Sequence, residues 1–207
     1  MADLKALSEA VIKGDQNKAL EITKAAISEG MAPATILNDG LISGMNVIGV
    51  RFKNNEVYIP EVLIAARAMK TAMEVLEPKL VEAGVQPLAK AAIGTVQGDL
   101  HDIGKNLVVM MLKGAGFDVV DLGVDVSPQK FVDKVKELQP KVIGMSALLT
   151  TTMPSMEKTI QAIKAAGLSV KTMIGGAPVT QAYADRIGAD GFAADAASAV
   201  DLAKSLI

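Results

Sequence analysis

Apolar residues between Leu4 and Gly84 recur at the spacing of an α-helix. The clearest helix follows Pro60, because one apolar residue returns every three or four positions and so forms a single stripe. That stripe consists of Val62, Ala65, Ala66, Met69, Met73, Leu76 and Leu80. Upstream, Asp15 suits a helix N-cap, Gly30 suits a helix end, and Pro33 suits the first turn of a third helix. The pattern predicts a four-helix bundle over residues 1–84.

The periodicity changes after residues 83–88, where a glycine and a proline close together indicate a linker. Beyond it, short apolar runs at 91–96, 117–122, 142–145, 170–174 and 191–193 alternate with helical stretches. The helical stretches are 102–114, 128–138, 154–166, 179–187 and 196–206. Strand alternating with helix predicts a parallel sheet covered on both faces. We therefore expect an α + α/β protein, with a flavodoxin-like (Rossmann-like) five-stranded domain over residues 89–207.

Composition excludes several classes of function. The net charge of −2 gives no basic field for nucleic acid or for an anionic membrane surface. The chain has no cysteine, which excludes disulfides, thiolate metal sites, iron–sulfur ligation and a cysteine nucleophile. The first residues lack the pattern of a signal peptide, so we expect a cytoplasmic protein without a membrane partner.

Ligands of an open parallel sheet bind beyond the carboxyl ends of its strands, so the loops that follow the strands are where a site is expected. The loop after the first strand carries the only histidine, His101, two residues after Asp99. At this spacing the carboxylate can accept a hydrogen bond from one ring nitrogen while the other nitrogen faces a metal. A single histidine cannot build a zinc site. A cofactor that supplies most of its own metal ligands, such as haem or a corrinoid, needs only one.

Three motifs in order make the pattern more specific: Asp99-x-His101-x-x-Gly104, Ser146-x-Leu148 and Gly175-Gly176. Together they resemble the cobalamin-binding signature of corrinoid methyltransferase proteins. The run at 44–52 and Ile59-Pro60-Glu61-Val62 resemble the helical cap that precedes the B12 domain of methionine synthase. The same cap occurs in the corrinoid proteins of methylamine, methanol and methoxyarene demethylation. The resemblance extends over essentially the whole chain.

The resemblance implies cobalamin bound base-off and His-on, with His101 as the axial cobalt ligand. It places Asp99 and Thr152 behind that histidine as the other residues of the reacting centre. It also implies a set of residues along the cofactor, from three loops of the sheet domain and from the helical cap. They are Gly98, Asp102, Ile103, Gly104, Ser146, Leu148, Thr150, Gly175 and Gly176 in the loops, and Phe52, Ile59 and Val62 in the cap.

The function implied by the resemblance is a methyl carrier that alternates between cob(I)alamin and methylcob(III)alamin. Its expected partners are a donor-specific methyltransferase, an acceptor methyltransferase that uses tetrahydrofolate or a thiol, and a reductive activator. Overall similarity leans toward a methoxyarene O-demethylase system. Two other B12 classes stay open, a small mutase subunit and a B12 sensor. The former would resemble only residues 90–207, and the latter usually presents a tryptophan that this chain lacks. A signalling receiver domain without B12 is disfavoured, because the acidic cluster after the first strand is missing.

Each motif also has a structural alternative. A histidine in such a loop is usually a surface residue, and Asp99 or Asp102 alone suits a helix N-cap. Gly175-Gly176 alone suits a turn, and Ser146 with its neighbouring threonines suits a polar loop. Phe52, Ile59 and Val62 suit the core of the bundle. The coincidence of three motifs at adjoining strand ends favours a site.

Overall fold

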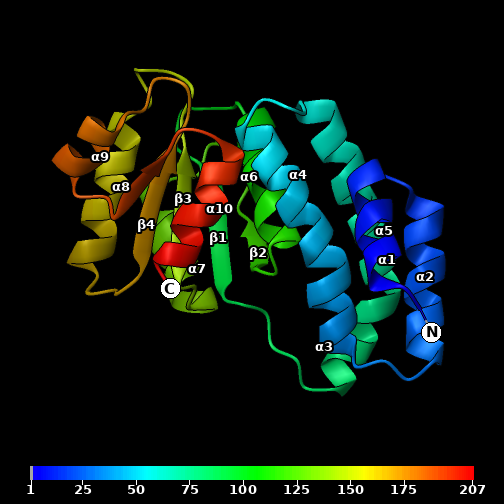
Figure 1. Ribbon diagram of the computed structural model, residues 1–207. Helices are drawn as coiled ribbons and strands as arrows, with labels where there is room; N and C mark the ends of the chain where they lie inside the picture. The colour runs from blue at the N-terminus through cyan, green and yellow to red at the C-terminus, as the bar shows by residue number, and fades with distance from the viewer. Residues whose placement is uncertain (1) are drawn as a thin grey trace. The chain divides into compact units, whose positions relative to one another are not determined.

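The computed structural model describes residues 2–207. The chain divides into two compact units, which we call the helical unit and the sheet unit. The helical unit runs to Pro87 and includes residues 114–116, and the sheet unit comprises the remainder from Leu88 to Ile207. Figure 1 shows the helical unit up to Pro87 from blue through cyan to blue-green, and the sheet unit from green to red. No helix of the described residues has both the length and the apolar character needed to cross a membrane.

Among the described residues, the helical unit consists of four helical segments, as predicted. They are α1 (Leu4–Lys13), α2 (Gln16–Ser28), a continuous segment over 33–53, and α5 (Ile59–Glu82). The continuous segment begins as α3 (Pro33–Thr35), widens into a π-helix, η1 (Ile36–Ile42), and ends as α4 (Ser43–Lys53). Asp15 caps α2 as expected, because its carboxylate accepts the Lys18 N–H at 3.0 Å.

Small residues let the helices of this unit approach closely. A Cβ on Gly40 would lie 2.5 Å from Leu7 of α1, and one on Gly44 would lie 2.8 Å from the Ser8 carbonyl oxygen. On α5, Ala68 and Ala72 are buried, whereas Ala66 and Met73 of the predicted stripe are only partly buried. The buried face of α5 is therefore rotated slightly from the predicted stripe, toward Ala68 and Ala72.

The sheet unit carries five parallel strands among the described residues, in the order β2-β1-β3-β4-β5. The strands are β1 (Lys90–Thr95), β2 (Asp118–Asp121), β3 (Val142–Ser146), β4 (Lys171–Gly175) and β5 (Gly191–Ala193). The helices between them are α6 (Ile103–Gly114), α7 (Pro128–Leu138), α8 (Pro154–Ala165) and α9 (Gln181–Ile187), and α10 (Ala196–Ser205) follows β5. The predicted α + α/β fold class is confirmed.

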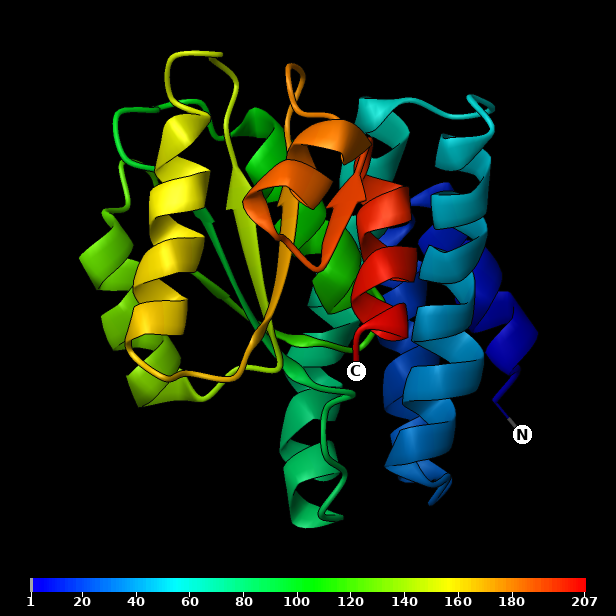
Figure 2. The same cartoon turned by 90° about the vertical axis from the view of Figure 1, so that its left-hand side faces the viewer.

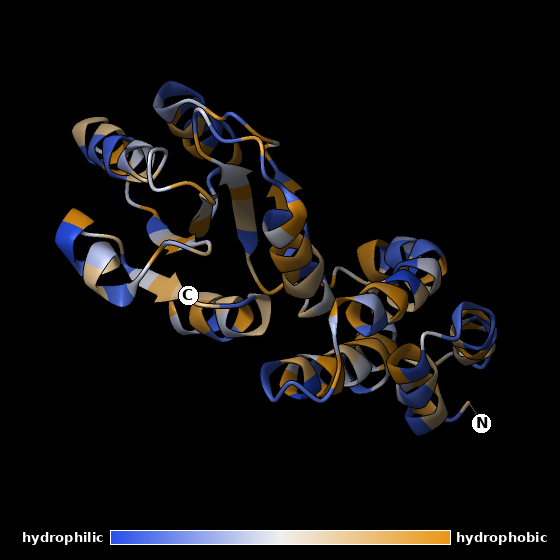
Figure 3. Ribbon diagram, turned by 90° about the horizontal axis from the view of Figure 1, so that it is seen from above, coloured by the Kyte–Doolittle hydropathy of each residue, from blue (hydrophilic) through white to orange (hydrophobic). Residues whose placement is uncertain are grey.

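Helices cover both faces of the sheet. One face is packed by α7, α8 and α9, whose buried side chains join those of the strands in one core around Phe131. The other face is covered by α6 and α10, and Figure 2 and Figure 3 show this layering from two directions. Burial on both faces explains why the strands read as nearly continuous apolar runs.

Strand register brings the predicted loops together. Thr95 at the end of β1 pairs with Ser146 at the end of β3, and Ser146 pairs with Gly175 at the end of β4. The three strands therefore end at the same level. The chain order also reverses between β1 and β3, which is the point where ligands of such sheets bind.

Candidate functional site

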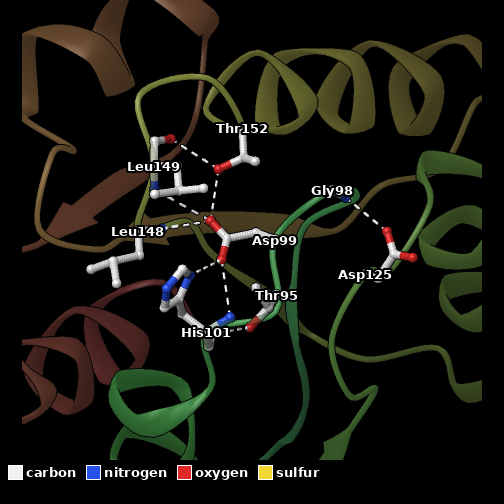
Figure 4. Close-up of polar contacts among 8 residues, drawn as sticks. All are labelled: Thr95, Gly98, Asp99, His101, Asp125, Leu148, Leu149 and Thr152. Carbon is white, nitrogen blue, oxygen red and sulfur yellow. Dashed lines mark hydrogen bonds and ion pairs between the residues drawn. The ribbon is translucent and has the colours of Figure 1, made fainter.

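The loop between β1 and α6 holds His101 against Asp99. The ring Nδ1 of His101 lies 2.8 Å from Asp99 Oδ1, and the same oxygen accepts the His101 backbone N–H at 3.0 Å (Figure 4). Because an ionised carboxylate only accepts hydrogen bonds, this contact assigns the proton of the neutral ring to Nδ1, and the lone pair of that tautomer is on Nε2. The His101 side chain is 50% exposed. Asp99 thus fixes the orientation of the ring through Nδ1, while half of the His101 side chain remains accessible to solvent.

Asp99 itself has no solvent exposure and is satisfied by hydrogen-bond donors. Its second oxygen, Oδ2, accepts the Thr152 hydroxyl at 2.7 Å and the Leu148 N–H at 2.8 Å, with the Leu149 N–H at 3.3 Å. Burial acts to raise the pKa of Asp99. The hydrogen bonds from Thr152, from the His101 and Leu148 amides and from the His101 ring outweigh it and hold the pKa well below its ordinary value. The carboxylate therefore stays ionised beside the ring.

These contacts decide between the alternatives for Asp99. Its carboxylate is directed to His101 and to the loop between β3 and α8, which is not the geometry of an N-cap of α6. Asp102 instead lies at the start of α6, where its carbonyl accepts the Asn106 N–H at 2.7 Å and its carboxylate accepts the Asn106 amide at 3.0 Å. Asp102 has a local role in helix initiation.

Further contacts hold the same loop, from residues that the sequence did not single out. The Thr95 hydroxyl donates to the His101 carbonyl at 3.0 Å, and the Ser155 hydroxyl donates to the Gln97 carbonyl at 3.1 Å. Asp125, in the loop between β2 and α7, accepts the Gly98 N–H at 2.7 Å. A threonine at the end of an otherwise apolar buried strand was a signal for Thr95. Asp125 follows β2, whose loop the sequence argument left aside.

A buried lysine fixes the first turn of α6. Lys105 is 3% exposed, and its ammonium binds the Asp121 carboxylate at the end of β2 and the Asn106 side chain. Burial of Asp121 acts to raise its pKa, but the Lys105 bond and the Gly123 N–H lower it overall. The helix that follows His101 is therefore tied to the neighbouring strand.

Apolar side chains are exposed in the segments that carry the histidine and its partners. The exposed fractions are 72% for Leu100, 76% for Ile103 and 43% for both Leu148 and Leu149. Exposed aliphatic groups in such a position suit a large apolar ring as ligand. Of the polar residues predicted here, Ser146 is half-buried and Thr150 is exposed.

The glycines of the motifs differ in what requires them. Gly176 has a φ of 128°, and a Cβ on it would lie 1.9 Å from the Ala147 carbonyl oxygen. On Gly175 it would lie 3.0 Å from the Ala193 carbonyl oxygen. The fold by itself therefore demands glycine at position 176, whereas an alanine at position 175 would make a tight contact with the Ala193 carbonyl oxygen. At Gly104, in contrast, no described residue would come within 4 Å of the added Cβ. A glycine there lowers helix propensity without an internal need, which suits close approach of a ligand.

The predicted cap residues lie in the helical unit and differ in exposure. Val62 is fully buried within that unit, which agrees with the core role that its sequence position also allowed. Phe52 is half-buried, and Ile59 is 41% exposed. Only Phe52 and Ile59 thus have surface to offer a ligand.

The donor set fits a cofactor that brings its own metal ligands. Among the described residues, no group of three or more His, Cys, Asp or Glu side chains is placed to hold a metal ion. The sheet unit offers one oriented imidazole nitrogen instead. A single nitrogen ligand is what a corrinoid cobalt requires from a protein, and the carboxylate behind the ring fixes the tautomer and the orientation of the imidazole.

Comparisons with known proteins show the family to which the chain belongs. A B12-binding domain model matches residues 89–202, and a second B12-binding domain model matches residues 3–77. A corrinoid protein of Desulfitobacterium hafniense is 39% identical over 100% of this chain and 98% of its own. A dimethylamine corrinoid protein of Methanosarcina acetivorans is 44% identical over 100% of both chains.

Solved structures show the same likeness. A cobalamin-binding protein from Desulfitobacterium hafniense matches with a TM-score of 0.84 and 35% identity, over 100% of both chains. The methanol:cobalamin methyltransferase complex from Methanosarcina barkeri matches with a TM-score of 0.87 and 27% identity, over 98% of this chain and 78% of the other. The chain therefore belongs to the family of B12-binding domain proteins, and within it to the corrinoid proteins.

Replacing Gly176 by alanine tests how tightly the loops after β3 and β4 pack. We expect Gly176→Ala to lower the free energy of unfolding by about 3 kcal/mol or more, because a positive φ and a backbone overlap both oppose the methyl group. Gly167→Ala is the matched control, since Gly167 also has a positive φ but open space around it. Urea denaturation followed by circular dichroism measures both. Equal losses would show that the overlap with Ala147 has no consequence.

The hydroxyl of Thr152 is expected to support the buried Asp99 carboxylate. Thr152→Val keeps the shape of the side chain but removes a donor from a buried charge, so we expect a loss of about 1–3 kcal/mol in the free energy of unfolding. Thr152→Ser keeps the donor and is expected to lose less. The same urea denaturation compares them. A valine variant as stable as the wild type would argue against this contact.

Proposed function

We propose that the protein is a corrinoid methyl carrier, in which His101 would hold the cobalt of cobalamin. The observation that carries the proposal is the pair of His101 and buried Asp99, which leaves Nε2 free to bind a metal. When bound, the cofactor supplies a nucleophilic cobalt that takes up and releases a methyl group. The residues of the chain bind and orient this group.

Each residue of the site has a defined task in this proposal. Asp99 holds the proton at Nδ1 of His101 and fixes the ring, and Thr152 holds Asp99. Gly104 allows the corrin to approach the start of α6, and Ile103 and Leu148 give it apolar contacts. The nucleotide tail of a base-off cofactor would contact Ser146, Thr150, Gly175 and Gly176, and Gly98 and Asp102 would also line the cofactor. The resemblance also assigns Phe52 and Ile59 of the helical unit to the cofactor.

The chain is proposed to act with partner enzymes that hold the methyl donor and the methyl acceptor. Relatives from Methanosarcina are named for dimethylamine and trimethylamine, and one similar structure is the methanol:cobalamin methyltransferase complex. Methylamines and methanol are thus donors to test beside methoxyarenes, which the overall sequence similarity favoured. Tetrahydrofolate or a thiol is the proposed acceptor, and a reductive activator restores the reduced cofactor.

The alternative of a mutase small subunit is less well supported. A mutase subunit was expected to resemble only residues 90–207, whereas a B12-binding domain model also matches residues 3–77. A helical module before the sheet unit favours the carrier.

Replacing His101 by alanine tests the metal ligand. Because His101 is half exposed, we expect His101→Ala to fold and to retain cobalamin through the nucleotide tail, but to lose the absorption spectrum of the His-on form. Added imidazole should restore that spectrum in the variant. An unchanged spectrum without imidazole would reject His101 as the ligand.

Methyl transfer tests the carrier function itself. The cobalamin-loaded, reduced protein is incubated with methyltransferases for methylamines, methanol and methoxyarenes, each with its donor. We expect one of them to methylate the cobalt, as measured by the absorption spectrum. The Methanosarcina dimethylamine corrinoid protein serves as positive control. If the control is methylated but this protein is methylated with none of the donors, the result would contradict the carrier function with these donors.

A further inference from the structure

Asp125 is hydrogen-bonded twice to the loop that carries His101. Its carboxylate Oδ1 accepts the Gly98 N–H at 2.7 Å, a contact drawn in Figure 4. Its own backbone N–H donates to the Asp99 carbonyl at 3.0 Å. The two hydrogen bonds lie on either side of the peptide unit that joins Gly98 to Asp99. They therefore fix the orientation of this peptide unit, and with it the position of the Asp99 main chain.

The backbone of both residues is adapted to this contact. Asp125 has a φ of 51°, in the left-handed region that few residues other than glycine, asparagine and aspartate enter. Gly98 has a φ of 85°. A residue held in a sparsely populated conformation persists only where its surroundings fix it, and such residues concentrate at functional sites.

Asp99 is thus held at both ends. Its carboxylate is fixed by the loop between β3 and α8, through Leu148 and Thr152. Its main chain is fixed by Asp125 and by the Val96 carbonyl, which accepts the Asp99 N–H at 3.1 Å. Since the Asp99 carboxylate in turn orients the imidazole of His101, a shift of the Asp99 main chain turns the ring.

We infer that Asp125 is a positioning residue that sets the orientation and the tautomer of His101 through the backbone of Gly98 and Asp99. This inference rests on the proposed function of His101 as the cobalt ligand. Gly98 and Asp125 are both exposed, so water can replace the lost hydrogen bond. Loss of the Asp125 carboxylate is therefore expected to change the stability of the fold little and the geometry of the ring more.

Three substitutions separate the acceptor from the backbone conformation. Asp125→Asn keeps an acceptor oxygen and tolerates the left-handed region. Asp125→Gly relaxes the backbone but removes the acceptor, and Asp125→Ala removes the acceptor and strains the backbone. Gln139→Ala is the matched control. Gln139 also has a positive φ, of 46°, but ends α7, away from the His101 loop.

The first readout uses protein without cofactor. Because His101 is the only histidine, labelling with ¹⁵N-histidine gives ring signals from this residue alone. At a fixed pH where the ring is neutral, we expect separate signals for a protonated Nδ1 and a bare Nε2 in the wild type, in Asp125→Asn and in Gln139→Ala. In Asp125→Ala and Asp125→Gly the two signals should move toward each other. Wild-type signals in both of these variants would overturn the inference, as would the same change in Gln139→Ala.

The second readout uses the cobalamin-loaded protein. We expect Asp125→Ala to weaken the His101–cobalt bond roughly 10-fold, as for other residues that orient a metal ligand. The ratio of His-on to His-off absorption measures this, and Asp125→Asn should restore it. An unchanged ratio in Asp125→Ala would overturn the inference. Failure of the wild type to bind cobalamin would instead overturn the proposed function, while the ring signals would still decide the effect of Asp125 on His101.

Discussion

The site depends on a carboxylate that is fully removed from solvent. An ionised group in such a place is tolerated only when hydrogen-bond donors surround it, and Asp99 is surrounded by the His101 ring, the Thr152 hydroxyl and backbone amides of two loops. The position of the loops and the position of Asp99 depend on each other. The loops after β1 and β3 must come together to satisfy Asp99, and Asp99 then fixes the ring that they present. One buried charge thus links the end of the sheet to the orientation of His101.

Much of the fold and of the site could be predicted from the sequence, because these features depend on local patterns of residues. The change from helical spacing to apolar runs of strand length predicted both units, and the rule for parallel sheets predicted which loops meet. The pairing of Asp99 with His101 followed from their separation of two residues. The buried face of α5 was predicted slightly wrongly, because the spacing of apolar residues alone does not show how closely α2 packs against this helix.

The remaining contacts depend on strand order and register, which the sequence does not display. Asp125 follows β2, and only the placement of β2 beside β1 brings it to Gly98. Gly176 looked like a residue kept small for the cofactor, yet the Ala147 carbonyl already requires it. Gly104 keeps the functional interpretation, since no described residue fills the space beside it. The glycines of the two motifs are thus explained by different constraints.

The central claim is the bond between His101 and cobalt, and electron paramagnetic resonance of the cob(II)alamin-loaded protein tests it most directly. A nitrogen bound along the cobalt axis splits the lines, as a triplet for ¹⁴N and as a doublet for ¹⁵N. The only histidine of the chain is His101, so ¹⁵N-histidine labels no other candidate ligand. We predict that labelling converts the triplet into a doublet. A triplet that labelling leaves unchanged would show that the base of the cofactor still occupies the position and would contradict the account.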